Sequence, residues 1–384
     1  MKIVIAPQAF KGSISALEAA KAMDKGVRKV FSQIETVLIP VADGGDGTLE
    51  TLVESSSGTL RTAEITGPLG EITTAHWGAM GDNQTAIIEM ARTSGLAMVP
   101  PAKRNPLITT TYGLGEMIRH AMEAGFRRFI IGIGGSATND GGTGMAQALG
   151  IHFTDLSGNE LPFGGAGLSK LHKIDISQID PRILQSEFMV ACDVSNPLTG
   201  PEGASEVYGP QKGATPEMVA QLDQALTHLA QVIRKDLGLE INDISGAGAA
   251  GGLGGGLIAF LNGKLRTGVD IVLDTLRLDD KLYGADLVIT GEGSLDFQTV
   301  YDKAPIGVAK RAKNNGIPVI AVSGSLGNGY TNIHEHGIDA ALAIIRYPMT
   351  LEESSQNASE LITDATEQAF RLLKVGTTLS NDFR

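Results

Sequence analysis

The chain of 384 residues has a single cysteine, Cys192, so it has neither an internal disulfide nor a zinc site built from cysteines. Such sparse use of cysteine is typical of the reducing cytosol, and we expect a cytoplasmic protein. No apolar run approaches the ~20 residues that a membrane span needs. The opening residues MKIVIAPQAFKGS have too short an apolar run before Pro7 for a signal peptide, so they predict a first strand instead.

The chain is also poor in aromatic residues and in clustered positive charge. Aromatic residues make up only 5% of it against 42% hydrophobic residues, so the core must be built from Val, Ile, Leu and Ala, as in buried parallel strands. The formal net charge is −12 and no block of Lys and Arg stands out, which argues against nucleic acid or an anionic membrane as a partner. The 49 glycines follow no triplet period, which excludes collagen and favours an α/β enzyme with many loops.

The first 60 residues alternate strand and helix patterns. Residues 2–6 predict a buried strand, Ser15 and Glu18 form a capping box, and apolar residues recur at helical spacing to about Phe31. A second strand is predicted over 36–42, with a short helix after it. This β-α-β-α order is typical of a parallel sheet.

The middle of the chain follows another pattern. From about residue 60, short apolar runs divided by GPLG and GDNQ predict antiparallel strands joined by tight turns. Alternation of helix and strand returns near residue 108 and marks the last hundred residues, which end in a helix predicted from the capping box of Thr350 and Glu353, with apolar positions as far as Leu372. The strand candidates of this last part are 286–290, 318–322 and 340–345.

The length of the chain exceeds one ordinary core, so two domains are expected. Because the two ends share one pattern and the middle has another, we expect an α/β protein of two α/β domains. Residues 1–60 and 285–384 would form a discontinuous, doubly wound parallel sheet of Rossmann or flavodoxin type, and 61–284 an inserted mixed α/β domain. The active site would lie in the cleft between them.

The stretch GIGGSATNDGG, residues 132–142, follows a predicted strand and is rich in glycine. Glycines after a strand let backbone N–H groups converge, and a helix N-terminus just beyond would add positive partial charge, which together favour phosphate or carboxylate. A tight strand–helix turn without a ligand is the alternative, and G-x-G-x-x-A is also a weak dinucleotide fingerprint. The candidate binding residues are Gly134, Gly135, Ser136, Thr138 and Asn139.

Two further glycine-rich loops, VADGGDGT at 41–48 and ITGEGSLDFQT at 289–299, have carboxylates at predicted strand ends. Ligands bind at the carboxyl ends of strands in open α/β sheets, and Mg²⁺ prefers oxygen ligands. Helix capping and Asp turns are the alternative explanation. The candidate metal ligands are Asp43, Glu292 and Asp296, with Asp46 beside the first, and Gly291 and Gly293 are candidates for binding phosphate.

Asp193, in ACDVSNPLTGPEGAS, ends another predicted strand before a loop rich in Pro and Gly. It could orient a substrate hydroxyl or accept its proton during phosphoryl transfer, whereas an Asx-turn would explain it structurally. Lys11 and Lys212 stand in loops where a lysine can neutralise the oxygens of a transferring phosphate, although a solvated surface lysine is the commoner case. These three are the candidate catalytic residues.

The stretch GAGAAG, residues 246–251, matches G-x-G-x-x-G and has Asp270 and Asp274 downstream. The residues before it do not predict a strand, so close helix packing is the favoured interpretation. The histidines show no zinc spacing, and neither a Walker A pattern nor a protein-kinase catalytic loop occurs. The residues by themselves therefore predict an α/β enzyme that handles a small anion, by phosphoryl transfer with Mg²⁺.

Seven stretches of the chain, taken in order, resemble the motifs of the bacterial glycerate kinase family. They are KIVIAPQAFKGS, PVADGGDGT, GIGGSATNDGGTG, ACDVSNPLTGP, GPQKGA, GAGAAGGLG and LVITGEGSLDFQT, and the resemblance extends from residue 2 to about 375. It implies ATP-dependent phosphorylation of D-glycerate, with Mg²⁺, in a cleft between two α/β domains, and a 2-kinase that forms 2-phosphoglycerate. The residues that match positions of the family's motifs are Lys11, Asp43, Asn139, Asp193, Lys212, Glu292 and Asp296.

This chain departs from the family's usual residues at five positions. Gln8 and Ala9 stand where Asp and Ser are usual, Ser195 where Asp is usual, Ser294 where Arg is usual, and Asp302 where Gly is usual. Ser cannot replace the fork of an Arg on an anion, which predicts lower activity or a different hydroxy acid. The alternatives left open are a non-catalytic protein that binds glycerate or nucleotide and a dinucleotide-dependent oxidoreductase. The sequence also leaves open a homodimer, the nucleotide preference and the hydroxyl that is phosphorylated.

Overall fold

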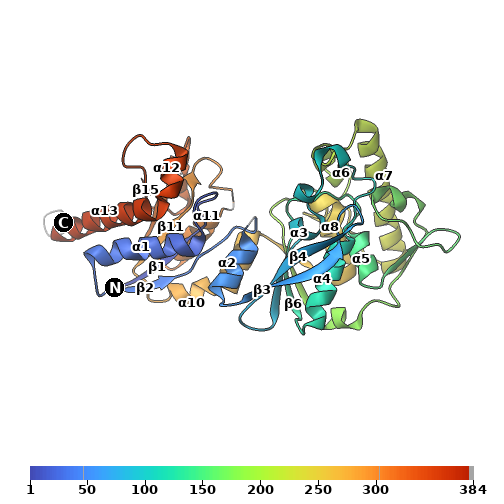
Figure 1. Ribbon diagram of the computed structural model, residues 1–384, viewed down its shortest axis with the longest axis horizontal. Coiled ribbons are helices and arrows are strands. Elements are labelled where there is room, and N and C mark those ends of the chain that lie inside the picture. The colour runs from blue at the N-terminus through green and yellow to red at the C-terminus, as the bar shows by residue number, and fades with distance from the viewer. Residues whose placement is uncertain (46, 302, 380–384) are drawn as a thin grey trace. The chain divides into compact units, whose positions relative to one another are not determined.

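The computed structural model describes residues 1–45, 47–301 and 303–379, and the chain divides into two compact units (Figure 1). Unit 1 combines the two ends of the chain, Met1–Ser56 and Val269–Arg384, and unit 2 is Ser57–Gly268. The acidic loop residues Asp46 and Asp302 lie outside the described residues. Within the described ranges, no helix has the length and apolar character that crossing a membrane requires.

Unit 1 is built on five parallel strands in the spatial order β15-β13-β11-β1-β2. Numbered within the unit and read from the β2 edge, this order is 2-1-3-4-5, the doubly wound arrangement of flavodoxin type. The predicted α/β class with a doubly wound parallel sheet is therefore confirmed. The strands are β1 (Lys2–Pro7), β2 (Glu35–Leu38), β11 (Leu287–Gly291), β13 (Val319–Ser323) and β15 (Ala340–Ala343).

Helices α1 (Ala16–Val30) and α13 (Ala358–Leu379) lie side by side in unit 1 (Figure 1). Gly26 permits this close approach, since a Cβ there would lie 2.5 Å from the Thr363 carbonyl oxygen. The other helices that pack into this unit are α2 (Thr48–Ser55), α9 (Gly268–Thr275), α10 (Leu278–Leu282), α11 (Ala304–Asn314), α12 (Leu351–Gln356) and the 3₁₀ helix Tyr330–His336. The short parallel strands β12 (Ser294–Leu295) and β14 (Ser325–Leu326) continue beyond β11 and β13.

Unit 2 is built on a mixed sheet in the order β10-β9-β6-β5-β4-β3. Strands β3, β4 and β5 are antiparallel neighbours, and tight turns over 67–70 and 80–83 join them, as predicted. The strands β5, β6, β9 and β10 run parallel, so their carboxyl ends share one edge. The bounds are β3 (Thr59–Thr66), β4 (Ile72–Ala79), β5 (Thr85–Glu89), β6 (Arg128–Gly132), β9 (Glu187–Ala191), β10 (Lys264–Arg266) and, in a separate antiparallel pair, β7 (His152–Thr154) and β8 (Lys173–Asp175).

The core of unit 2 includes Phe129 of β6 and Phe188 of β9, whose rings stack with centroids 4.8 Å apart, and Trp77 of β4, whose ring meets Phe126 edge to face at 5.2 Å. The helices of the unit are α3 (Ala91–Ser94), α4 (Tyr112–Glu123), α5 (Thr143–Ala148), α6 (Ala204–Tyr208), α7 (Pro216–Leu237) and α8 (Ala249–Leu261). Its 3₁₀ helices are Leu96–Met98, Pro101–Lys103, Gly165–Lys170, Pro181–Gln185 and Pro210–Lys212.

Two predicted elements of unit 1 differ from the structure. The strand expected over 36–42 ends at Leu38, although the N–H groups of Ile39 and Val41 still donate to the carbonyl oxygens of Ile5 and Pro7. The single final helix is wrong: the capping box of Thr350 and Glu353 begins only α12, and α13 starts anew after Asn357. Leu372, expected on the apolar face of that helix, is 67% exposed.

Candidate active site

The strand order of unit 1 changes direction between β1 and β11, and doubly wound sheets bind ligands at such a switch point. Gln8 follows β1, Asp43 lies in the loop after β2, and Glu292 follows β11. Gln8 hydrogen-bonds Asp43, and the negative charge of Asp43 acts on Glu292. The structure therefore places these two carboxylates in one group, which we call the strand-end group of unit 1.

Asp43 is held in its ionised form. Lys303 Nζ lies 3.2 Å from Asp43 Oδ2, and the Gly45 N–H donates to Asp43 Oδ1 at 3.2 Å. Burial raises the pKa of Asp43, but the Gln8 hydrogen bond, the Lys303 ammonium and the Gly45 N–H together hold it below its ordinary value. Lys303 had no role in the sequence analysis, since only the fold brings it beside a loop 260 residues earlier.

Glu292 has the opposite electrostatic environment. Burial raises the pKa of Glu292 to about 7, and the charges of Asp43 and Asp296 act in the same direction. The hydrogen bond that Thr299 Oγ1 donates to Glu292 Oε1, at 3.1 Å, and the charge of Lys303 only partly oppose this. Carboxylates with such shifted pKa values are enriched at functional sites.

Two of these carboxylates fit a Mg²⁺ ion better than the third. Asp43 and Glu292 repel each other, which a cation would relieve, and Gln8 Oε1 beside them is buried without a hydrogen-bond partner. Asp296 instead accepts the Gln298 N–H at 2.8 Å, as in an Asx-turn. Within the described ranges, no group of three His, Cys, Asp or Glu residues is placed to hold a metal, but Mg²⁺ commonly takes only one or two carboxylates together with substrate phosphates and water.

The two glycines of the β11 loop have different reasons to be glycine. A Cβ at Gly291 would lie 1.9 Å from the Val322 carbonyl oxygen, so packing of neighbouring backbone excludes a side chain. A Cβ at Gly293 would meet Lys11 N at 3.5 Å, an ordinary contact. Gly293 and the exposed Lys11 thus lie close together at the ends of β11 and β1. Ser294, beside them, bonds Ser325 through the two hydroxyls at 3.0 Å.

In unit 2 the glycine-rich stretch 132–142, which we call the glycine loop, follows β6 as predicted. Gly134 and Gly135 are exposed, and no atom would lie within 4 Å of a Cβ at Gly134. Ser136, Thr138 and Asn139 are buried beneath them. The helix expected over 140–150 is only α5, which begins at Thr143 and is too short to add much dipole charge.

A buried network holds the glycine loop from below. Lys212 is 1% exposed and its Nζ donates to the Thr138 carbonyl oxygen at 2.7 Å. Burial lowers the pKa of Lys212 to about 7, while the charge of Asp140 raises it. Asp140 is fully buried and accepts the N–H and the hydroxyl of Thr111, both at 2.8 Å, and the Gly142 N–H at 3.1 Å.

Sequence reasoning missed Asp140, although it stands within the glycine loop. Its partner Thr111 lies 29 residues earlier, so no local pattern reveals the pairing. Burial raises the pKa of Asp140, and the hydrogen bonds from Thr111, Gly142 and Gly144 only partly oppose this. When Asp140 is ionised, its negative charge favours the charged form of Lys212.

The glycines of 246–251 allow close packing, which is against loops and not against another helix. A Cβ at Gly248 would lie 2.1 Å from the Pro197 carbonyl oxygen, and one at Gly251 would lie 2.0 Å from that of Thr138. Positive φ angles at Ala250, Gly251 and Gly252 kink the start of α8. The stretch follows α7 and a loop and not a strand, so it lacks the strand–turn–helix context of a dinucleotide fingerprint.

Asp193 lies just after β9 and is exposed. Its Oδ1 accepts the Gly268 N–H at 2.8 Å, so it stabilises the first residue of α9. Asn139 donates through Nδ2 to Ser205 Oγ at 2.9 Å, while its Oδ1 is buried without a hydrogen-bond partner. Lys11, Asp43, Glu292 and Asp296 thus belong to unit 1, and Asn139, Asp193 and Lys212 to unit 2. The catalytic and binding roles of these residues stay predictions.

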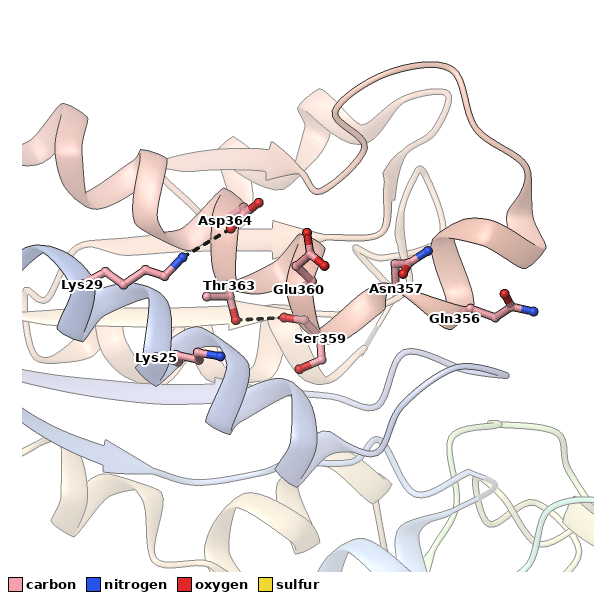
Figure 2. A pocket seen from close by; sticks show the side chains of 8 residues that line it. All are labelled: Lys25, Lys29, Gln356, Asn357, Ser359, Glu360, Thr363 and Asp364. Carbon is pink, nitrogen blue, oxygen red and sulfur yellow. Dashed lines mark hydrogen bonds and ion pairs between the residues drawn. The ribbon is translucent and has the colours of Figure 1, made fainter.

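A separate pocket of about 390 Å³ lies on unit 1, where side chains of α1 and of the start of α13 converge (Figure 2). Three of its charged side chains are paired: Lys29 Nζ lies 3.4 Å from Asp364 Oδ1 and 2.9 Å from Glu367 Oε2, and Glu360 Oε1 lies 3.0 Å from Arg346 Nη2. The pocket includes none of the predicted site residues.

Comparison with known proteins identifies the family. The model of the glycerate kinase family matches residues 3–374. The chain is 51% identical over 373 residues to a glycerate kinase of Halalkalibacterium halodurans, covering 97% of both chains. It is 49% identical over 376 residues to the glycerate 2-kinase of Escherichia coli (strain K12), covering 98% of this chain and 99% of that one.

A solved structure agrees with both the family and the fold. The crystal structure of a protein assigned as glycerate kinase 2 from Salmonella typhimurium LT2 superposes with a TM-score of 0.92 at 51% identity, covering 99% of this chain and 100% of that one. This chain therefore belongs to the glycerate kinase family, and it is an ATP-dependent kinase.

Proposed function

We propose that this chain transfers the γ-phosphoryl group of ATP to the 2-hydroxyl of D-glycerate and releases 2-phosphoglycerate and ADP. The observation that carries the proposal is the 49% identity to E. coli glycerate 2-kinase over nearly the full length of both chains. The strand-end group of unit 1 and the glycine loop and Asp193 of unit 2 supply the types of side chain that phosphoryl transfer needs. The proposal requires the two groups to act on one pair of substrates, in the interdomain cleft that the sequence predicts.

In this mechanism the 2-hydroxyl oxygen of glycerate attacks the γ-phosphorus, the bond to the bridging oxygen breaks, and ADP leaves. Asp193 would orient the hydroxyl and accept its proton, since its carboxylate is exposed. Lys11 would neutralise the transferring oxygens, and Lys212 would act through the Thr138 carbonyl. Asp43 and Glu292, with Asp296 near them, would hold Mg²⁺, which when bound would neutralise the charge of the β- and γ-phosphates.

A second candidate is a glycerate-binding or nucleotide-binding protein with weak turnover. Ser294, where the family usually has Arg, is exposed and bonds only another hydroxyl, that of Ser325, among the hydrogen bonds described for its side chain. A hydroxyl pair cannot replace a guanidinium at a phosphate. A cytoplasmic location, a homodimer and the expectation of no nucleic-acid or membrane partner stay predictions.

The test is an assay of ADP release with ATP, Mg²⁺ and D-glycerate, followed by phosphorus NMR of the product. Turnover that gives the 2-phosphate supports the proposal, and it should stop when the metal is chelated and resume when Mg²⁺ is restored. Calorimetric binding of D-glycerate with no ADP formed would favour the second candidate. The 3-phosphate as product would refute the proposed position of transfer.

A further inference from the structure

Buried polar atoms without partners gather around the glycine loop. Among the described side chains, four such atoms belong to unit 2, and every one of them lies on the loop or on the segment 94–104: Ser94 Oγ, Arg104 Nε, Thr138 Oγ1 and Asn139 Oδ1. The residues Ser94, Thr138 and Asn139 have no exposed surface. Because an unmade buried hydrogen bond is costly, such a concentration points to a ligand rather than to a packing defect.

The segment 94–111 runs along the glycine loop. The Ala137 N–H donates to the Ser94 carbonyl oxygen at 3.0 Å, and Leu96 N–H to that of Gly135 at 2.8 Å. Further along, the Thr109 hydroxyl donates to the Ala137 carbonyl oxygen at 2.8 Å. Arg104 stands between these contacts in the sequence, so its backbone is fixed on both sides by the loop.

Two glycines also pack closely against Arg104 and the residues near it. A Cβ at Gly213, next to the loop-binding Lys212, would lie 2.5 Å from the Arg104 carbonyl oxygen. A Cβ at Gly165 would lie 2.5 Å from the Asn139 carbonyl oxygen and 3.3 Å from that of Pro106. Arg104 therefore belongs to the same packed layer as Lys212 and Asn139.

The guanidinium of Arg104 makes no hydrogen bond, ion pair or ring contact within the described part of the chain, although its Nε is buried. Other arginines are held by carboxylates, such as Arg92 by Glu89 at 2.6 Å and Arg182 by Asp180 at 2.6 Å. In a chain with a net charge of −12, a partly buried cation without an acidic partner is uncommon. The second cation of this layer, Lys212, already donates to Thr138.

We propose that Arg104 binds the carboxylate of the hydroxy acid substrate, with Ser94, Thr138 and Asn139 completing a specificity subsite on the glycine loop. The inference rests on the proposed function, since it names the residue that selects an acid rather than a neutral alcohol. A guanidinium fork matches a carboxylate through two parallel N–H bonds, and the loop's exposed glycines leave its backbone open to a small acid. The phosphates of ATP then bind elsewhere.

The experiment compares Arg104→Met and Arg104→Lys with Arg128→Met, an exposed arginine at the opposite end of β6. For Arg104→Met we expect kcat/KM for D-glycerate to fall by a factor of about 10 to 150, the range of a hydrogen bond to a charged group, mainly through KM. The KM for ATP should not change. Arg104→Lys should keep part of the affinity, and Arg128→Met should match the wild type. Thermal unfolding of each variant shows whether the fold is retained.

Calorimetric titration of D-glycerate, without nucleotide, separates this inference from the proposed kinase reaction. Binding by the wild type that is lost in Arg104→Met supports the subsite, even if the wild type does not turn over. A folded Arg104→Met protein that binds and phosphorylates glycerate as the wild type does would overturn it. A higher KM for ATP with that for glycerate unchanged would overturn it as well, because Arg104 would then bind phosphate.

Discussion

Replacing Glu292 with Gln should change how the stability of unit 1 depends on pH. The ordinary pKa of a Glu is 4.5, and burial raises that of Glu292 to about 7. Between these two values the folded state binds more protons than the unfolded state, so the wild type loses stability as the pH rises. Below 4.5 the carboxyl is neutral in both states and costs nothing, and above about 7 the full penalty is present.

The size of the penalty follows from the two pKa values. The difference between about 7 and 4.5, at about 1.4 kcal/mol for each pH unit, amounts to about 3 kcal/mol. Gln keeps an oxygen that can accept from Thr299 but never ionises. Glu292→Gln should therefore be little changed at pH 4.5, and its advantage over the wild type should grow to about 3 kcal/mol by pH 8.

Scanning calorimetry or circular dichroism is the assay to use. The chain has one tryptophan, Trp77, which belongs to unit 2, so tryptophan fluorescence would follow the wrong unit. Glu335→Gln is the control, since this exposed glutamate belongs to the same unit. A difference between Glu292→Gln and the wild type that stays constant from pH 4.5 to pH 8 would refute the argument, and so would one that shrinks.

Three further predictions concern unit 2. Burial lowers the pKa of Lys212 from 10.5 to about 7, so the wild type should gain free energy of unfolding as the pH rises between these values. Lys212→Met should not show this gain, which measurement of the free energy of unfolding across the range checks. A variant whose stability rises with pH as steeply as that of the wild type would contradict the argument. Gly256→Ala should lower the free energy of unfolding by about 1–3 kcal/mol, because its Cβ would meet the Gly141 carbonyl oxygen at 2.3 Å. Gly134→Ala should lower it little, since no atom lies within 4 Å of a Cβ there. A denaturant titration that ranks the two variants the other way would refute this packing argument. Asp193→Asn should lower kcat by about 10²–10⁴ and keep the bond to Gly268, so steady-state rates that match the wild type would remove Asp193 from the mechanism.

Local signals predicted most of the fold. The capping box of Ser15 and Glu18 begins α1 as expected, since both hydrogen bonds lie within four residues. The short strands β7, β8, β12 and β14 were not predicted, because two or three residues carry no hydrophobic period. The final helix was predicted as one because its capping box and its apolar stripe come from two helices that follow each other directly.

The candidate site was predictable only where a strand ends. Asp43, Asp193 and Glu292 stand just after predicted strands, and parallel strands put their carboxyl ends at one edge. Lys303 and Arg104 follow no such rule. Lys303 contacts Asp43, which lies 260 residues earlier in the chain, and Arg104 stands out because its buried Nε has no hydrogen-bond partner. The sequence therefore offered Asp43, Asp193 and Glu292 as candidates, whereas Asp140, Lys303 and Arg104 came to notice only from the structure.

The discontinuous build of unit 1 has a consequence for synthesis on the ribosome. Strand β1 pairs with β11, so Ile3 must wait for Leu287 before the centre of its sheet can form. Unit 2 is one continuous stretch, Ser57–Gly268, and it emerges complete while the first 56 residues still have no sheet to join. Unit 2 should therefore fold first. Nascent chains that stop near residue 300, with β11 still inside the ribosome, should protect unit 2 from protease but leave β1 and α1 open to cleavage.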